Sequence, residues 1–304
     1  MILEEKQNNN IFRKMVFFAN WKIYMKSRLE VQKYVEVINN ELNGFNTDIL
    51  EVHIMTDFLS FEYVKKNLKD KNIKVGVQDL FWEDYGSFAG EVSPLMLKDL
   101  GCDSAYIGHS ERKLYFGETD ENINKKIIAC LRNNITPMFF IGETKEELMQ
   151  GKTEEVLKRQ LAIGLKDINP KFIEKIIFIY EPRWAIGQKD SASPDLIREM
   201  HLKTRQLIDE LYNEVYVRNE KTGNEIIGNE ITRNEITGNK SAGIKSAVRV
   251  LYGGSVNLEN LNQIISIDQV DGVGAARAAI ESKNFIKFIK EIENIGFLRA
   301  RWIK

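Results

Sequence analysis

Residues 180–187 read Tyr-Glu-Pro-Arg-Trp-Ala-Ile-Gly, and they begin at the last residue of an apolar run, residues 176–180. A buried strand that ends in a carboxylate, Glu181, and then enters a loop is typical of a catalytic base beneath a lid. Pro182 fixes φ where the loop begins, Gly187 permits backbone geometry closed to other residues, and the apolar side chains between them are suited to excluding water. A carboxylate in an ordinary surface loop is nevertheless the commoner arrangement. The rest of the chain decides between these two interpretations.

Length and composition describe a chain with enough apolar residues for a large core. The 304 residues are 43% hydrophobic, which suits one or two domains. A single α/β barrel of about 250 residues with additions also fits. The two cysteines, Cys102 and Cys130, lie in apolar segments without metal-ligand spacing, so we expect reduced, buried thiols.

The charge balance and the hydropathy exclude several classes of partner. Lys and Arg number 43 against 44 for Asp and Glu, so the chain has no basic field for nucleic acid. No apolar run reaches the roughly 18 residues that a membrane span needs. Residues 1–14 also lack the apolar core of a signal peptide. We therefore expect a cytoplasmic protein with a short polar N-terminal arm over residues 1–14 and no nucleic-acid or membrane partner.

Short apolar runs alternate with longer amphipathic segments from residue 15 onward. The runs interpreted as strands buried in a parallel sheet are residues 15–21, 52–56, 73–78, 105–107, 137–141, 176–180, 248–252 and 270–272. The segments interpreted as helices are residues 29–42, 58–68, 93–100, 121–133, 145–165, 194–211, 258–265 and 282–292. Eight strand–helix units predict an α/β fold, either a closed barrel or an open, doubly wound sheet.

One segment between the sixth predicted helix and the seventh predicted strand has a different sequence periodicity. An Asn recurs at every fifth position from Asn219 to Asn239, and a period of five fits neither a helix nor a strand. About twenty residues are too few to bury a face of their own as a packed repeat domain. We interpret residues 214–246 as a flexible, Asn-, Glu- and Gly-rich surface insertion that interrupts a single domain, residues 15–304.

Polar side chains follow two of the predicted strands, at the end where barrels build their active sites. Asn20 and Lys22 lie at the end of the first strand, and His109 follows the fourth. The chain has three histidines, and the other two lie in an apolar strand and in mid-helix, where a structural role is simplest. His109 precedes Ser110 and Glu111, which are placed to orient it and Lys22. On this ground alone a structural role for His109 remains the commoner outcome.

Two loops rich in small residues follow the seventh and eighth strands. Residues 252–256 read Tyr-Gly-Gly-Ser-Val, and residues 272–277 read Gly-Val-Gly-Ala-Ala-Arg. Glycines let backbone N–H groups approach an anion, and the hydroxyl of Ser255 adds a donor, so a phosphate group would fit. A Gly-Gly pair is more often a plain turn. Phosphate sites in barrels do form from these two loops, so each observation strengthens the other.

Five motifs together resemble the triosephosphate isomerase family. They are Asn20-Trp21-Lys22, residues 108–112 (Gly-His-Ser-Glu-Arg), residues 116–120 (Phe-Gly-Glu-Thr-Asp), residues 180–187 and residues 252–256, in the family's order and nearly its spacing. The resemblance covers about residues 16–292 apart from the insertion. It implies a (β/α)8 TIM barrel that acts as a homodimer on a small sugar phosphate in glycolysis and gluconeogenesis, with no metal and no cofactor.

The resemblance also implies roles for single residues. By position, Glu181 matches the family's catalytic base and His109 its electrophile, and Lys22 and Asn20 match its substrate contacts. Gly187 and Ser255 match its phosphate ligands, and Ala276 and Arg277 lie in its last phosphate loop. The residues expected to support the catalytic groups are Ser110, Glu111 and Trp184. The implied reaction interconverts dihydroxyacetone phosphate and glyceraldehyde 3-phosphate. A proton next to a carbonyl is too weakly acidic for water to remove at neutral pH. The enzyme therefore needs a placed base, and positive charge from Lys22 would help to stabilise the enediolate.

Four departures from the family's pattern leave the substrate open. The lid continues with Gln188-Lys189-Asp190 instead of Thr-Gly-Lys, Arg183 replaces a small apolar residue, Ala276-Arg277 replaces a Gly-Gly pair, and Ala89 stands where Thr is usual. One alternative is an isomerase of a four-carbon ketose phosphate, an erythrulose phosphate, since a longer substrate needs a reshaped phosphate end. Another is a phosphate-binding barrel without turnover, although that role would need neither Glu181 nor His109.

Overall fold

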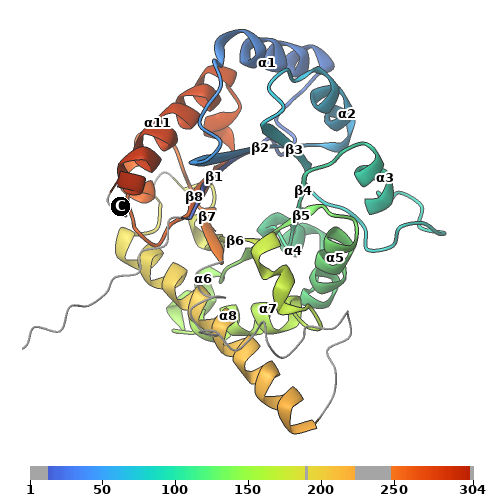
Figure 1. Ribbon diagram of the computed structural model, residues 1–304, viewed down its shortest axis with the longest axis vertical. Coiled ribbons are helices and arrows are strands. Elements are labelled where there is room, and N and C mark those ends of the chain that lie inside the picture. The colour runs from blue at the N-terminus through green and yellow to red at the C-terminus, as the bar shows by residue number, and fades with distance from the viewer. Residues whose placement is uncertain (1–12, 189–190, 223–247, 302–304) are drawn as a thin grey trace, which may run out of the picture.

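The computed structural model describes residues 13–188, 191–222 and 248–301, and these form a closed barrel. Its eight parallel strands pair in sequence order, and the last pairs with the first. They are β1 (Met15–Asn20), β2 (Leu50–Thr56), β3 (Ile73–Val77), β4 (Ser104–Ile107), β5 (Thr136–Ile141), β6 (Ile177–Tyr180), β7 (Arg249–Tyr252) and β8 (Gly272–Ala275). Figure 1 shows the helices around them. The closed barrel, one of the two architectures that the alternation allowed, is confirmed.

Helices connect the strands on the outside of the barrel. They are α1 (Arg28–Glu41), α2 (Phe58–Asn67), α3 (Pro94–Asp99), α4 (Ser110–Phe116), α5 (Asp120–Arg132), α6 (Lys145–Met149), α7 (Thr153–Gly164), α8 (Pro194–Thr222), α10 (Leu261–Ile265) and α11 (Ser282–Arg301), with the 3-10 turns η1 (Pro170–Lys175), η2 (Arg183–Ala185) and η3 (Arg277–Ala279). Local chemistry sets several helix starts. Ser93 accepts a hydrogen bond from Met96 N–H just ahead of Pro94, which suits the first position of a helix.

The barrel closes because its strands are apolar on both faces. Side chains that pack together in a separate, smaller core cluster are Val16, Phe18, Met55, Tyr106, Met138, Phe140, Ile177, Ile179 and Leu251. Alternate residues of the same strands join the larger core beneath the helices, where Phe17 stacks on Phe288 of α11 with ring centroids 5.1 Å apart. Strands of this kind have no polar face for water, and closure leaves them no unpaired edge.

Several boundaries differ from the predicted ones for local reasons. The predicted helix over residues 145–165 is two helices, because Gly151 adopts φ 68° between α6 and α7. The seven residues of α4 were not predicted, since so short a helix shows little periodicity. β8 begins at Gly272 instead of residue 270, and its Gly-Val-Gly-Ala sequence lacks the large apolar residues that mark the other strands.

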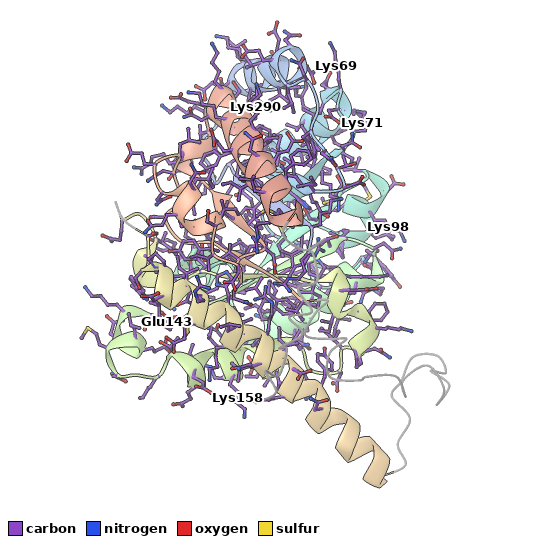
Figure 2. All side chains as sticks on the ribbon, turned by 60° about the vertical axis from the view of Figure 1, so that its left-hand side comes forward. Lys69, Lys71, Lys98, Glu143, Lys158 and Lys290 are labelled. Atoms are coloured by element: carbon purple, nitrogen blue, oxygen red, sulfur yellow. The ribbon has the colours of Figure 1, made fainter. Side chains whose placement is uncertain are left out.

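The end of α8 lies beyond the predicted start of the insertion. The helix was predicted to end at residue 211 but continues to Thr222, so residues 214–222 are helical. Figures 1 and 2 show its last turns extending away from the barrel. The rest of the predicted insertion, residues 223–246, and residues 1–12 of the predicted arm lie outside the described residues. Among the helices of the described ranges, none is long and apolar enough to cross a membrane.

His201 of α8 is a fully buried histidine whose charge state is set by the core. Its Nδ1 lies 2.7 Å from the Ile197 carbonyl oxygen, and its ring meets that of Tyr180 edge to face at 6.0 Å. Burial, together with the nearby Arg205 guanidinium, lowers the pKa of His201 from 6.5 to about 3. The native protein therefore keeps the ring neutral at pH values where the unfolded chain protonates it.

We expect acid to weaken the fold through His201. Between pH 6.5 and about 3, the unfolded state binds a proton that the native state does not. The free energy of unfolding therefore falls as pH decreases, by about 1.4 kcal/mol per pH unit for this group. Urea unfolding measures this. Between pH 6.5 and roughly pH 5, the free energy of unfolding should fall by about 2 kcal/mol more in the wild type than in His201→Gln. Equal losses in the two proteins would contradict this assignment.

Candidate active site

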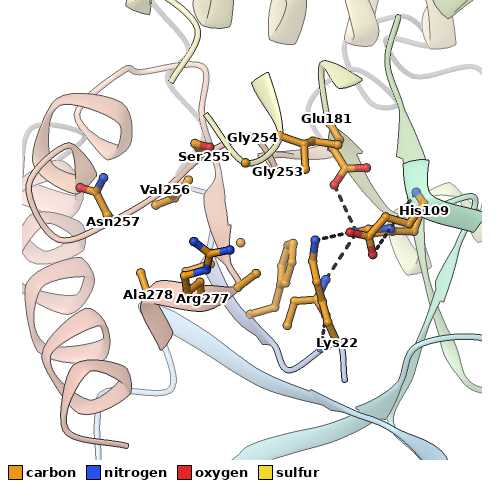
Figure 3. Close-up of a pocket in the computed structure, with 18 of the residues that line it drawn as sticks. Lys22, His109, Glu181, Gly253, Gly254, Ser255, Val256, Asn257, Arg277 and Ala278 are labelled. Atoms are coloured by element: carbon orange, nitrogen blue, oxygen red, sulfur yellow. Dashed lines mark hydrogen bonds and ion pairs between the residues drawn. The ribbon is translucent and has the colours of Figure 1, made fainter. Parts of the chain in front are cut away.

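A pocket of about 430 Å³ opens at the carboxyl ends of the strands (Figure 3). Its walls come from the loops after β1, β4, β6, β7 and β8. Nine of the predicted site residues line it: Asn20, Lys22, His109, Glu111, Glu181, Gly187, Ser255, Ala276 and Arg277. The other two, Ser110 and Trp184, lie outside the lining: Ser110 N–H donates to Glu181, and Trp184 bonds Glu143, which is not a lining residue. The structure therefore brings together residues that are far apart in the sequence.

Glu181 follows β6 directly and is held by both its backbone and its carboxylate. Its N–H donates to the Ile141 carbonyl oxygen at 2.8 Å. A Cβ on Gly142 would overlap the Glu181 carbonyl group, so only glycine lets these two loops approach so closely. Glu181 Oε2 accepts from Ser110 N–H at 3.0 Å, and Oε1 lies 3.3 Å from His109 Nε2. Because Glu181 is only 5% exposed, little water competes for its carboxylate.

His109 caps the N-terminus of α4 and turns its Nε2 toward Glu181. Its Nδ1 accepts from Glu111 N–H at 3.3 Å. A ring nitrogen that accepts a hydrogen bond carries no proton, so this contact indicates a neutral ring protonated on Nε2. Phe140 meets the ring edge to face at 4.9 Å, and Tyr106 lies nearly parallel to it at 5.9 Å. A neutral imidazole fixed in this way can donate its Nε2–H into the pocket and take a proton back.

Lys22 has a strained backbone, and its side chain lines the same pocket as Glu181 and His109. Its φ of 45° is uncommon for a residue with a side chain. Two hydrogen bonds hold it there, from Lys22 N–H to Asn20 Oδ1 at 2.9 Å and from Gln78 Nε2 to the Lys22 carbonyl oxygen at 2.9 Å. The Lys22 ammonium pairs with Glu111 Oε1 at 2.6 Å. Glu111 thereby connects the β1 loop to the loop that carries His109.

A buried group of charges supports the His109 loop from below. Glu118 Oε2 accepts from Gly108 N–H at 3.1 Å. Lys126 Nζ lies 2.5 Å from Glu118 Oε1 and 2.6 Å from Asp79 Oδ1. Arg112 adds a further ion pair to Asp79 at 2.8 Å. Sequence analysis did not find this support, because a lysine in mid-helix and an aspartate in a loop have no pattern of their own.

The loop after β6, called the lid below, comprises residues 182–192, of which 182–188 and 191–192 are described. Its first half is fastened by Trp184, whose Nε1 donates to Glu143 Oε1 at 2.7 Å. The Tyr180 hydroxyl lies 3.2 Å from both oxygens of Glu143, which is fully buried. Sequence analysis missed Glu143, although it follows β5 closely and the rule that selected strand-end polar residues would have found it.

The lid is also fastened to the end of β7 and to the loop that follows it. Ala192 N–H donates to the Tyr252 hydroxyl at 2.9 Å. Ser255 Oγ lies 2.8 Å from the carbonyl oxygens of both Ala185 and Gln188, and its single proton can be donated to one of them at a time. Ser255, predicted to bind phosphate, therefore directs its hydroxyl to the lid, which leaves its backbone amide as the group for a ligand.

Backbone amides line the side of the pocket opposite His109. Within the described part of the chain, no acceptor is found for the N–H groups of Gly187, Gly254, Ser255, Ala276 and Arg277. These amides come from the lid and from the loops after β7 and β8, and Figure 3 shows Ser255 and Arg277 across the pocket from His109. Unpaired amides at the end of a pocket suit an anion such as a phosphate group.

Comparison with known proteins identifies the family. The family model described as triosephosphate isomerase matches residues 15–221 and 224–292. The protein named triosephosphate isomerase in Dictyoglomus thermophilum is 35% identical over 278 residues, which cover 91% of this chain and 99% of that protein. The protein of the same name in Thermodesulfovibrio yellowstonii is 37% identical over 277 residues, covering 91% and 99% of the two chains. This chain is thus an isomerase that belongs to the triosephosphate isomerase family.

Proposed function

We propose that this protein interconverts dihydroxyacetone phosphate and glyceraldehyde 3-phosphate, as a cytoplasmic enzyme of glycolysis and gluconeogenesis. One observation carries the proposal. Glu181 Oε1 and His109 Nε2 lie 3.3 Å apart in a pocket whose opposite side presents unpaired amides. Proton transfer between adjacent carbons needs a base and a neutral donor, and a phosphate group needs the amides. The names of the relatives agree with this substrate.

The proposed reaction uses the residues in a defined order. Glu181 removes the proton from the carbon next to the carbonyl, and the electron pair moves onto the carbonyl oxygen to give an enediolate. His109 donates its Nε2–H to that oxygen while the Lys22 ammonium adds positive charge, and both lower the energy of the transition state. Glu181 then returns the proton to the adjacent carbon, and His109 moves the hydroxyl proton between the two oxygens. Base, acid and cation all come from this chain.

Initial rates on glyceraldehyde 3-phosphate and on erythrulose phosphate, compared as kcat/KM, test the substrate. A preference for the triose supports the proposal. A preference for the tetrulose would establish the second candidate, which is favoured by one observation: Arg277 and Gln188, two of the departures from the family's pattern, both line the pocket. Turnover of neither substrate would instead favour a phosphate-binding barrel without catalysis.

We expect Trp184→Phe to lower kcat/KM about tenfold. Phenylalanine keeps an apolar ring but loses the Nε1–H that bonds Glu143 at 2.7 Å. A hydrogen bond to a charged group is worth about 1.5–3 kcal/mol, so the fastened lid becomes less populated by a factor of ten or more. Water then reaches the enediolate, and more inorganic phosphate is released per turnover. Trp82→Phe is the matched control, since the Trp82 ring packs on Phe81 and Lys125, away from the lid. Equal effects in both variants would contradict a role for the Trp184 contact.

The proposal includes a homodimer. Large apolar residues are exposed on α4 and on the loops after β1 and β3, at the same end of the barrel as the pocket: Ile23, Tyr85, Phe88, Leu114, Tyr115 and Phe116. Exposed apolar groups on this scale are typical of a surface that another chain covers. Sedimentation equilibrium should give the mass of two chains, and the mass of one chain at micromolar concentration would contradict the dimer.

A further inference from the structure

The loop after β8 places a second cation in the pocket. Arg277 lines the pocket, and in Figure 3 its guanidinium points toward the space between Lys22 and the loop with Gly253 and Gly254. Lys22 is paired with Glu111 at 2.6 Å. For Arg277, in contrast, the described residues offer no carboxylate within ion-pair distance. The pocket therefore holds one cation that is neutralised within the protein and one that is not.

An aromatic ring lies beside this second cation. The Arg277 guanidinium carbon is 6.0 Å from the centre of the Tyr24 ring, and Tyr24 also lines the pocket. The two side chains come from the loops after β1 and β8, which are neighbouring strands of the barrel. A guanidinium at this distance from an aromatic face is attracted to it, which limits how far the otherwise mobile arginine side chain turns toward solvent.

We propose that Arg277 binds the phosphate group of the substrate directly and that Tyr24 is the positioning residue that keeps its guanidinium in the pocket. This inference rests on the proposed function. Backbone amides of the lid and of the loops after β7 and β8 border the same space, so a phosphate there meets amides and a guanidinium together. The planar fork of arginine matches two phosphate oxygens, and full positive charge favours the dianion over the monoanion. Arg277 thereby sets the preference for a doubly charged phosphate.

Calorimetric titration with inorganic phosphate tests the proposal without turnover. We expect Arg277→Gln to weaken phosphate binding about 10- to 100-fold, the range for a lost charge-assisted hydrogen bond. Arg277→Lys should recover part of this loss, because it restores the charge without the fork. The value of kcat/KM should fall in parallel with phosphate affinity, and mostly through KM. The control is Lys158→Gln, which removes one charge from the exposed surface of α7 (Figure 2) and should bind phosphate as the wild type does.

The role of Tyr24 is tested by two variants and a double mutant. Tyr24→Phe keeps the ring and should bind phosphate within about twofold of the wild type, whereas Tyr24→Leu should bind it several-fold more weakly. Combined with Arg277→Gln, Tyr24→Leu should cause no further loss, since the two residues act through one contact. Equal losses for Tyr24→Phe and Tyr24→Leu would overturn the positioning role.

Two results would overturn the role of Arg277 itself. One is unchanged phosphate affinity in Arg277→Gln, and the other is an equal loss in Lys158→Gln, which would show a general charge effect. The outcome is separate from that of the proposed function. If the wild type binds phosphate through Arg277 but does not isomerise triose phosphate, the inference stands and the proposed function fails.

Discussion

Glu181→Gln is expected to lower kcat by about three orders of magnitude, within the range of about 10² to 10⁴ for a lost general base. Glutamine has the shape of glutamate and can still accept from Ser110 N–H, which donates to Glu181 at 3.0 Å, so the loop should keep its structure. It cannot take a proton from carbon. KM should change little, because the proposed contacts to the phosphate group lie on the other side of the pocket. Initial rates in both directions and the melting temperature measure these effects.

Two controls make the Glu181 result specific. Glu36→Gln removes the same charge from an exposed position on α1 and should behave as the wild type does. Exchange of solvent deuterium into the substrate reports proton abstraction even when no product forms, and Glu181→Gln should slow it about as much as it slows turnover. A kcat within about tenfold of the wild type, or exchange at the wild-type rate, would remove Glu181 as the base.

His109→Asn should lower kcat about 100- to 1,000-fold, as expected for a lost donor to a developing oxyanion. Asparagine is among the best helix caps, and its Oδ1 can accept from Glu111 N–H in place of Nδ1, which does so at 3.3 Å. The variant therefore removes the Nε2–H and keeps the cap of α4. Its melting temperature should stay close to that of the wild type, so that lost activity reports chemistry.

His109→Gln provides the matched comparison. Its longer side chain carries an amide N–H toward the position of Nε2, so it should regain part of the rate that His109→Asn loses, although it cannot exchange a proton between two oxygens. Similar melting temperatures with a clear difference in kcat would support the role of Nε2. A loss below about tenfold in His109→Asn would contradict it.

The strands were predictable because their composition is distinctive, and the failures occurred where it is not. β5 and β6 are runs of large apolar residues that are suited to burial on both faces. β8 is Gly-Val-Gly-Ala, and its start was misplaced. Helix ends were also less predictable than helix centres. α8 was predicted to end at residue 211 but continues to Thr222, and only its last residues, from Asn219, belong to the five-residue repeat that suggested a loop.

The candidate site could be found from the sequence only where residues stand at strand ends. That rule placed Glu181, His109 and Lys22, which line one pocket. It did not reveal contacts that depend on folding. Lys126 and Asp79 are 47 positions apart and meet only because α5 packs beside the β3 loop. The contact between Tyr24 and Arg277 likewise depends on the fold, which brings the loops after β1 and β8 side by side.

The loops that make up the pocket have consequences for how such a protein evolves. Glu181 and His109 follow β6 and β4, whereas Ala276 and Arg277 follow β8 and touch neither of them in the hydrogen-bond pattern of the described residues. Mutations after β8 can therefore accumulate in a duplicated gene while the pair that moves the proton stays intact. Selection could then change which sugar phosphate is accepted. The intermediate variants would keep the residues that move the proton.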